Sequence, residues 1–102
     1  MYGSIFRMKP KKGKEKALLD MMTEWEKVRR PKVKGSIAGY MMRPDNKPGE
    51  IIGVAVFTDK KAYRVNAEDP EQHKWYLKMR ELLDADPVWE DGEYVAGGSG
   101  SK

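Results

Sequence analysis

The sequence predicts an α+β fold in which two helices cover one face of a four-stranded antiparallel sheet. First, residues 51–57 form an unbroken apolar run of strand length, with apolar side chains on both faces. Second, residues 14–30 and 70–85 repeat apolar residues at the three- and four-residue spacing of a helix. Third, residues 44–49 are dense in turn formers and join two strand-like segments as a hairpin would.

The chain begins with an expected strand over residues 2–9, which Pro10 ends. A helix over residues 14–30 follows, and Pro31 stops it because proline forces the preceding residue out of helical geometry. A second strand is expected over residues 33–43. The apolar stripe of the helix consists of Leu18, Met21, Met22, Trp25 and Val28.

After the apolar run, Thr58 is expected to cap a short helix over residues 59–66. A longer helix has a stronger start signal. Asp69 suits the N-cap, and Pro70 suits the first helical position. Gln72 lies three residues after the cap, as in a capping box. Its buried stripe consists of Trp75, Tyr76, Met79, Leu82 and Leu83.

The last strand is expected over residues 88–96, with a bulge or turn at Asp91-Gly92. The order is therefore β-α-β-β-α-β in one domain over residues 1–96, which is the ferredoxin-like arrangement. Both helices then lie on one face, although the run at 51–57 is apolar on both faces. We therefore expect a second copy of the chain to cover the other face. Residues 97–102 have the composition of a flexible tail.

Composition excludes several classes of protein. The chain has no cysteine, so it has neither disulfides nor thiolate metal sites, which fits a cytoplasmic protein. No stretch is long and apolar enough for a membrane span or a signal peptide. One histidine and scattered carboxylates give no metal site. The basic residues are spread over several elements, so we read them as surface charge and expect no nucleic-acid partner.

Four segments together resemble the antibiotic biosynthesis monooxygenase-like family of the dimeric α+β barrel superfamily. They are residues 9–14 (KPKKGK), 33–40 (VKGSIAGY), 56–63 (VFTDKKAY) and 86–92 (DPVWEDG). The resemblance implies a homodimer whose sheets pack face to face as an eight-stranded barrel, with a cavity between each sheet and its helices. It also implies oxygenation of polyphenols, anthrones or quinols without metal or flavin, so no cofactor is expected.

The candidate catalytic residues are His73 and Tyr63. His73 is the only side chain that ordinarily titrates near neutral pH, and it could accept a phenolic proton. It lies roughly 120° from the centre of the apolar stripe at about 100° per residue, so a surface histidine is the alternative. The haem-degrading branch of the superfamily has a tryptophan ten residues before its histidine and an asparagine on the first strand. This chain has Tyr63 there, and Phe6 or Arg7 on the strand, so haem degradation is not expected.

Aromatic residues are abundant, and a flat ligand would stack well among them. The alternative is that they are simply core, and both can hold where the core-facing side of a helix is also the cavity wall. The candidate substrate-binding residues are Trp25, Tyr40, Asn66, Trp75, Tyr76 and Trp89.

Three functions remain open from sequence. The first is a cofactor-independent monooxygenase acting on an aromatic or quinol-type small molecule, which needs a cavity that the methionines and tryptophans of the helices do not fill. The second is a non-catalytic dimeric binding protein of the same fold. The third is an RNA-binding module, which would need exposed aromatics on the first and third strands. Ile52, Val54 and Val56 instead favour packing of one sheet on another.

Overall fold

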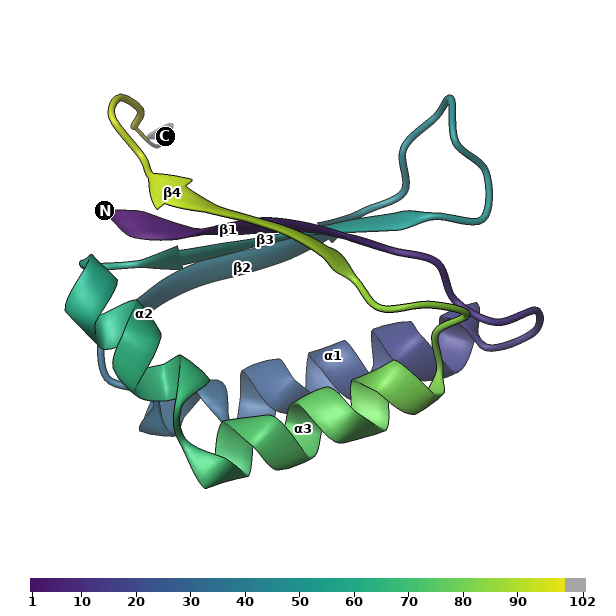
Figure 1. The fold of residues 1–102 in the computed structure, drawn as a ribbon, viewed down its shortest axis with the longest axis horizontal. Coiled ribbons are helices and arrows are strands. Elements are labelled where there is room, and N and C mark those ends of the chain that lie inside the picture. Colours follow the sequence, from purple (N-terminus) through teal and green to yellow (C-terminus); the bar gives the residue numbers. More distant parts are fainter. Residues whose placement is uncertain (99–102) are drawn as a thin grey trace.

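The computed structural model describes residues 1–98 and confirms the ferredoxin-like order of elements. The sheet is antiparallel throughout, with strand order β2-β3-β1-β4. All three α-helices lie on one side of this sheet (Figure 1). The elements are β1 (Tyr2–Met8), α1 (Glu15–Val28), a 3-10 helix η1 (Arg30–Lys32), β2 (Ser36–Met42), β3 (Ile51–Phe57), α2 (Lys60–Ala67), α3 (Pro70–Glu81) and β4 (Val88–Glu93).

The pairing of β1 with β3 decides which side chains face the helices. Phe6 lies opposite Gly53, and Met8 lies opposite Ile51. These four residues are buried, as expected for the helix-facing side. Gly53 is needed there, because a Cβ atom at this position would stand 2.3 Å from Cζ of Phe6. The ring of Phe6 therefore lies directly over the backbone of β3.

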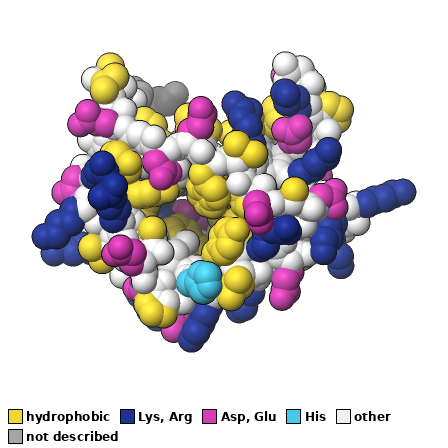
Figure 2. Space-filling view, viewed as in Figure 1, with side chains coloured by type: hydrophobic (Ala, Val, Ile, Leu, Met, Phe, Trp, Pro, Cys, Tyr) yellow, Lys and Arg dark blue, Asp and Glu magenta, His cyan; other side chains and the backbone are white. Residues whose placement is uncertain are grey.

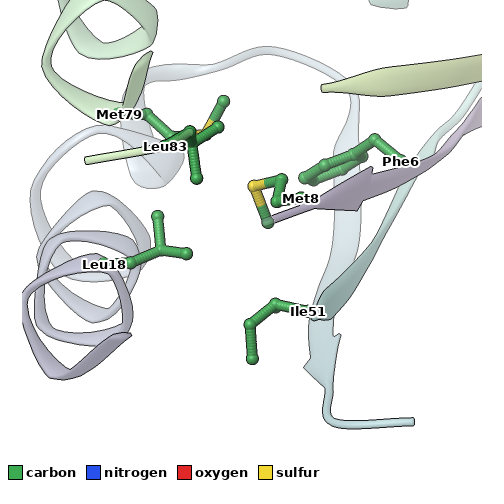
Figure 3. Close-up of a cluster of buried hydrophobic side chains, with 6 residues drawn as sticks. All are labelled: Phe6, Met8, Leu18, Ile51, Met79 and Leu83. Atoms are coloured by element: carbon green, nitrogen blue, oxygen red, sulfur yellow. The ribbon is translucent and has the colours of Figure 1, made fainter. Parts of the chain in front are cut away.

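The buried core gathers at one end of the space between sheet and helices. At this end, Lys11 N donates to Leu82 O at 2.8 Å, and Asp84 N donates to Lys9 O at 2.9 Å. These bonds tie the end of α3 to the end of β1, so sheet and helices are close here and diverge toward α2 (Figure 1). The core side chains are Phe6, Met8, Leu18, Ile51, Met79 and Leu83 (Figure 3).

The opposite sheet face, which we call the open face, carries apolar side chains without a helix to cover them. Ile5, Met42 and Val88 are 38%, 54% and 63% exposed. Among the described residues, β1 and β3 present no aromatic side chain on this face, since Tyr2, Phe6 and Phe57 face the helices. The RNA-binding alternative therefore lacks the stacking aromatics that it requires.

Tyr94, just after β4, folds back across the open face. Its hydroxyl donates to Ala55 O at 3.0 Å, and its ring passes over Gly3. Gly3 permits this because a Cβ atom there would stand 1.8 Å from Ala55 O and 3.1 Å from the Tyr94 ring.

Two expected helix starts differ in detail. The cap of α2 is Asp59 and not Thr58, because Asp59 Oδ1 accepts from Ala62 N at 2.8 Å. Asp69 does cap α3, accepting from Glu71 N at 2.8 Å. Gln72 does not complete a capping box, because its side chain bonds to an indole on α1 instead.

Several expected boundaries were too long. The helix expected to residue 30 ends at Val28 and continues as the 3-10 turn that contains Pro31. The second strand starts only at Ser36, since the chain turns at Gly35 with φ 84°. The helix expected to residue 85 ends at Glu81.

The last strand also differs from expectation, as β4 pairs continuously through Asp91 and Gly92 without a bulge and ends at Glu93. Residues 99–102 of the expected tail lie outside the described residues. No helix in the described part of the chain has the length and apolar character needed to cross a membrane.

Candidate functional site

A cavity of about 590 Å³ lies between the sheet and the helices, next to the core. Figure 2 shows it as a hollow with hydrophobic side chains around its mouth and the histidine at its edge. Its volume falls within the range of small-molecule sites. Met21, Met22, Trp25, Trp75 and Met79 line this space and leave it open. The small-molecule hypothesis required a cavity that these methionines and tryptophans do not fill, and such a cavity is present.

Aromatic side chains from both long helices and from β4 border the cavity. Trp25 on α1 donates its indole N–H to Gln72 Oε1 on α3 at 3.0 Å, which links the two helices across the cavity. The ring of Trp89 lies 4.6 Å from that of Phe6, tilted by 31°. The cavity is thus bordered by flat apolar surfaces, and the predicted residues Trp25, Trp75, Tyr76 and Trp89 all lie on its wall.

Tyr63 on α2 supplies a polar group at the wide end. Its hydroxyl donates to Asp91 Oδ1 on β4 at 2.9 Å. Its ring makes edge contacts with Tyr2 and Phe57, each at 5.4 Å between centroids. Burial, with a smaller contribution from Asp91, raises the pKa of Tyr63 to about 12, although the hydroxyl of Ser4 opposes this. Tyr63 is therefore protonated at neutral pH and cannot be the general base.

Ser4 lies beside this pair, on the helix-facing side of β1. The register places Ser4 directly opposite Asp91, so the two side chains are neighbours on the same face. Ser4 is 2% exposed and lines the cavity, but its hydroxyl makes no hydrogen bond of good geometry. Such an unmet group is uncommon in a folded protein.

Asn66 lies one turn after Tyr63 on α2 and lines the same end. Arg29 Nη2 donates to Asn66 Oδ1 at 2.9 Å and pairs with Asp69 at 3.1 Å. Because a guanidinium only donates hydrogen bonds, the amide oxygen of Asn66 must face Arg29. The amide NH₂ of Asn66 is then left for the cavity, so this residue offers donors there.

His73 is exposed and borders the mouth of the cavity. Its ring stacks on that of Tyr76, with 6.3 Å between centroids and 21° between planes. The residue thus combines both sequence interpretations, since it lies on the surface and also faces the opening. A molecule in the mouth could reach its imidazole, whereas the polar end near Tyr63 is served by other groups.

Tyr40 borders the cavity, but its side chain is 72% exposed. It pairs with Val54 and so projects to the open face, opposite to its neighbour Met41. Arg43, a further polar candidate, pairs with Glu15 at 2.6 Å. Among the described residues, no group of three His, Cys, Asp or Glu side chains could hold a metal ion.

Sequence reasoning missed four residues of this site, which are Ser4, Arg29, Gln72 and Asp91. Gln72 was read only as a capping residue, and Asp91 only as part of a bulge. Ser4 and Asp91 come together because β4 pairs with β1, and no local pattern gives that register. The strand alternation alone could have placed Ser4 on the buried face with Phe6.

Comparison with known proteins confirms the expected fold. No family model and no curated protein matches the chain. Solved structures match closely in shape at low identity. A protein of unknown function from Nitrosomonas europaea, NE2512, has a TM-score of 0.79 at 18% identity, covering 99% of this chain and 95% of its own.

Two further structures carry functional names. One named antibiotic biosynthesis monooxygenase has a TM-score of 0.74 at 15% identity, covering 94% of this chain and all of its own. SnoaB, a cofactor-independent oxygenase from Streptomyces nogalater crystallised as a mutant, has a TM-score of 0.77 at 16% identity, covering 94% of each chain. The chain thus has the fold of antibiotic biosynthesis monooxygenases.

Proposed function

We propose that this protein binds a planar aromatic or quinol-type molecule in its cavity and oxygenates it without a bound cofactor. The observation that carries the proposal is an apolar, aromatic-walled cavity of about 590 Å³ with one polar end. The fold shared with SnoaB, which is named a cofactor-independent oxygenase, supports it.

In this proposal the walls and the polar end have different roles. Trp25, Trp75, Tyr76 and Trp89 contact the faces and edges of the aromatic rings. Asn66 donates to an oxygen of the substrate and so favours the anion formed on deprotonation. His73 at the mouth accepts the proton. The electron-rich anion then passes an electron to O₂, and one oxygen atom enters the substrate while the other leaves as water.

We also propose that the protein is a homodimer through its open face. Apolar side chains there are exposed on β1, β2 and β4, for example Ile5, Tyr40, Met42 and Val88, and those of β3 on this face are half-buried. Their burial against an identical sheet is favourable at about 25 cal/mol for each Å² of apolar surface. The two cavities, each on the helix side of its sheet, remain open in such an assembly.

Oxygen consumption tests the catalytic proposal. The purified protein is mixed with a panel of anthrones and quinols while dissolved O₂ is followed, and we expect uptake above the rate without protein. His73→Ala should reduce this rate by about 10²-fold or more if His73 is the base. Lys74→Ala, in the next position on the same exposed helix turn, is the matched control and should leave the rate unchanged. Unchanged turnover in His73→Ala removes His73 from the mechanism.

A second candidate function is binding of the same class of molecule without turnover. The exposure of His73 at the mouth favours it, because the imidazole then stands in solvent and away from the polar end near Tyr63. Saturable binding of an anthrone, followed by calorimetry, without protein-dependent O₂ uptake would select this function over the first.

A further inference from the structure

The open face of the sheet, which lies away from the helices in Figure 1, carries two charged side chains. Alternate residues of a strand point to opposite faces, so the pairing registers assign the residues of this face. Within the four strands, all residues of the open face are uncharged except Arg7 on β1 and Glu90 on β4. One cation and one anion therefore lie among apolar side chains.

Arg7 and Glu90 are both exposed, and apolar residues flank them. Arg7 lies opposite Ile52 on β3 and Val88 on β4, and Glu90 lies opposite Ile5 on β1. The two charges are thus diagonal neighbours on adjacent strands. Neither forms an ion pair with any residue that the structure describes.

Covering the open face would remove water from these two charges. A second sheet packs at about 10 Å from the first, which leaves little room for solvent between them. A charge that is buried without an opposite charge is strongly destabilising. The covering surface must therefore offer an anion to Arg7 and a cation to Glu90, in addition to apolar side chains.

A second copy of the chain is a surface that meets both requirements. In a two-fold dimer, contact of one residue with another across the interface is always made twice, with the roles exchanged. Contact of Arg7 with Arg7, or of Glu90 with Glu90, would bring like charges together. Contact of Arg7 with Glu90 neutralises all four charges of the two copies.

We propose that Arg7 of each protomer pairs with Glu90 of the partner subunit, so that two reciprocal ion pairs fix how the two open faces are aligned. This inference rests on the proposed homodimer. It adds the residues that select a second copy as the partner, and it places the two-fold axis near the pair of strands β1 and β4.

Charge reversal tests the pairing by analytical ultracentrifugation. Arg7→Glu gives each protomer two anions on this face, and Glu90→Arg gives it two cations. We expect either change to raise the dissociation constant of the dimer by about 10²-fold or more. Lys27→Glu on α1 and Glu81→Arg on α3 are the matched controls at exposed helix positions and should leave the dimer intact.

Mixing the two reversed chains separates pairing between protomers from pairing within one. In an equimolar mixture of the Arg7→Glu and Glu90→Arg chains, residue 7 of each chain again meets an opposite charge at residue 90 of the other. We expect a heterodimer to form with nearly the wild-type dissociation constant. An ion pair within one chain would not return on mixing, so a mixture that stays monomeric overturns the proposal.

Neutral variants repeat the test without introducing repulsion. Arg7→Met and Glu90→Gln should each weaken the dimer by about tenfold or more, and the double variant should weaken it by less than the product of the two effects. Independent effects overturn the pairing. Circular dichroism checks that each chain is folded.

The wild type distinguishes failure of this inference from failure of the proposed homodimer. A wild type that is monomeric at micromolar concentration overturns both. A dimeric wild type whose dissociation constant is unchanged by Arg7→Glu and Glu90→Arg overturns the pairing and leaves the homodimer standing.

Discussion

Tyr63 has surroundings that keep its phenol protonated well above the ordinary range. Burial is the main cause, and the bond to Asp91 adds to it. The pKa of this phenol rises from 10.0 in the unfolded chain to about 12 in the fold, so the unfolded state loses its proton first. The free energy of unfolding should therefore fall as pH rises from about 10 through about 12.

Tyr63→Phe should remove this part of the alkaline loss of stability. Urea unfolding below and above pH 10 should show a smaller decline in the variant than in the wild type. Tyr76→Phe, a change at a phenol on α3 outside this hydrogen bond, is the control and should keep the wild-type decline. Identical declines in wild type and Tyr63→Phe would contradict the raised pKa.

Arg29 is a buried cation that orients the side chain of Asn66 through a hydrogen bond. It is 9% exposed and holds the amide oxygen of Asn66 while pairing with Asp69. Arg29→Lys keeps the charge but loses the planar fork that reaches both partners. We expect an aromatic ketone to bind about five- to tenfold more weakly, because the amide of Asn66 is then free to turn.

A double-mutant cycle tests whether Arg29 acts on ligand binding through the orientation of Asn66. Asn66→Ala should lower affinity for the ketone to a similar degree, and Arg29→Lys added to it should cost little more. Additive losses would instead mean that Arg29 acts on binding by another route. Circular dichroism of each variant checks that the fold is retained.

Residue positions on one helix could be predicted to act together, but positions on different elements could not. Tyr63 and Asn66 are three residues apart on α2, which places them on one face. Tyr63 and Asp91 are 28 residues apart and meet only through the register of β4. The bond from Trp25 to Gln72 spans 47 residues in the same way.

At the scale of elements, the close approach of β1 to β3 depends on glycine at position 3, which has no side chain. Gly3→Ala would place a Cβ atom 1.8 Å from Ala55 O, in the backbone of the next strand. The strands must separate and Tyr94 must leave its place, so we expect a loss of roughly 3 kcal/mol or more in the free energy of unfolding.

Gly92→Ala is the matched control for this prediction. Gly92 pairs with Gly3 across the same sheet, but a Cβ atom there meets nothing within 4 Å. Denaturant unfolding should therefore show little change for Gly92→Ala. Equal losses in the two variants would show that glycine matters for β propensity here and not for space.

Element types were predictable because each has a strong local signal, whereas their ends were not. The apolar run of β3 and the cap of α3 at Asp69 are such signals. The start of β2 is set by the turn at Gly35. The carbonyl oxygen of Gly35 accepts a hydrogen bond from Thr58 N, which lies in another part of the chain. Asp59, and not the predicted Thr58, caps α2. Both residue types suit the N-cap, so sequence alone does not decide between them.

At the scale of the whole molecule, the open face makes a clear prediction about assembly. Val54→Glu places a charge at the middle of that face, opposite Ile5 on β1 and Tyr40 on β2, where an identical sheet would bury it twice by symmetry. We expect the wild type to sediment as a dimer at micromolar concentration and the variant as a monomer. Val65→Glu, an exposed apolar site on α2, is the control and should stay dimeric. A monomeric wild type would contradict the assembly.

The wedge between sheet and helices has a consequence for motion. The narrow end is held by the six buried side chains and by the bonds of Lys11 and Asp84, whereas α2 at the wide end has no fully buried side chain of its own. Amide protons of α2 should therefore exchange with deuterium long before those of β1. Entry and release of a ligand would then require only local opening of this short helix, while the rest of the molecule keeps its structure.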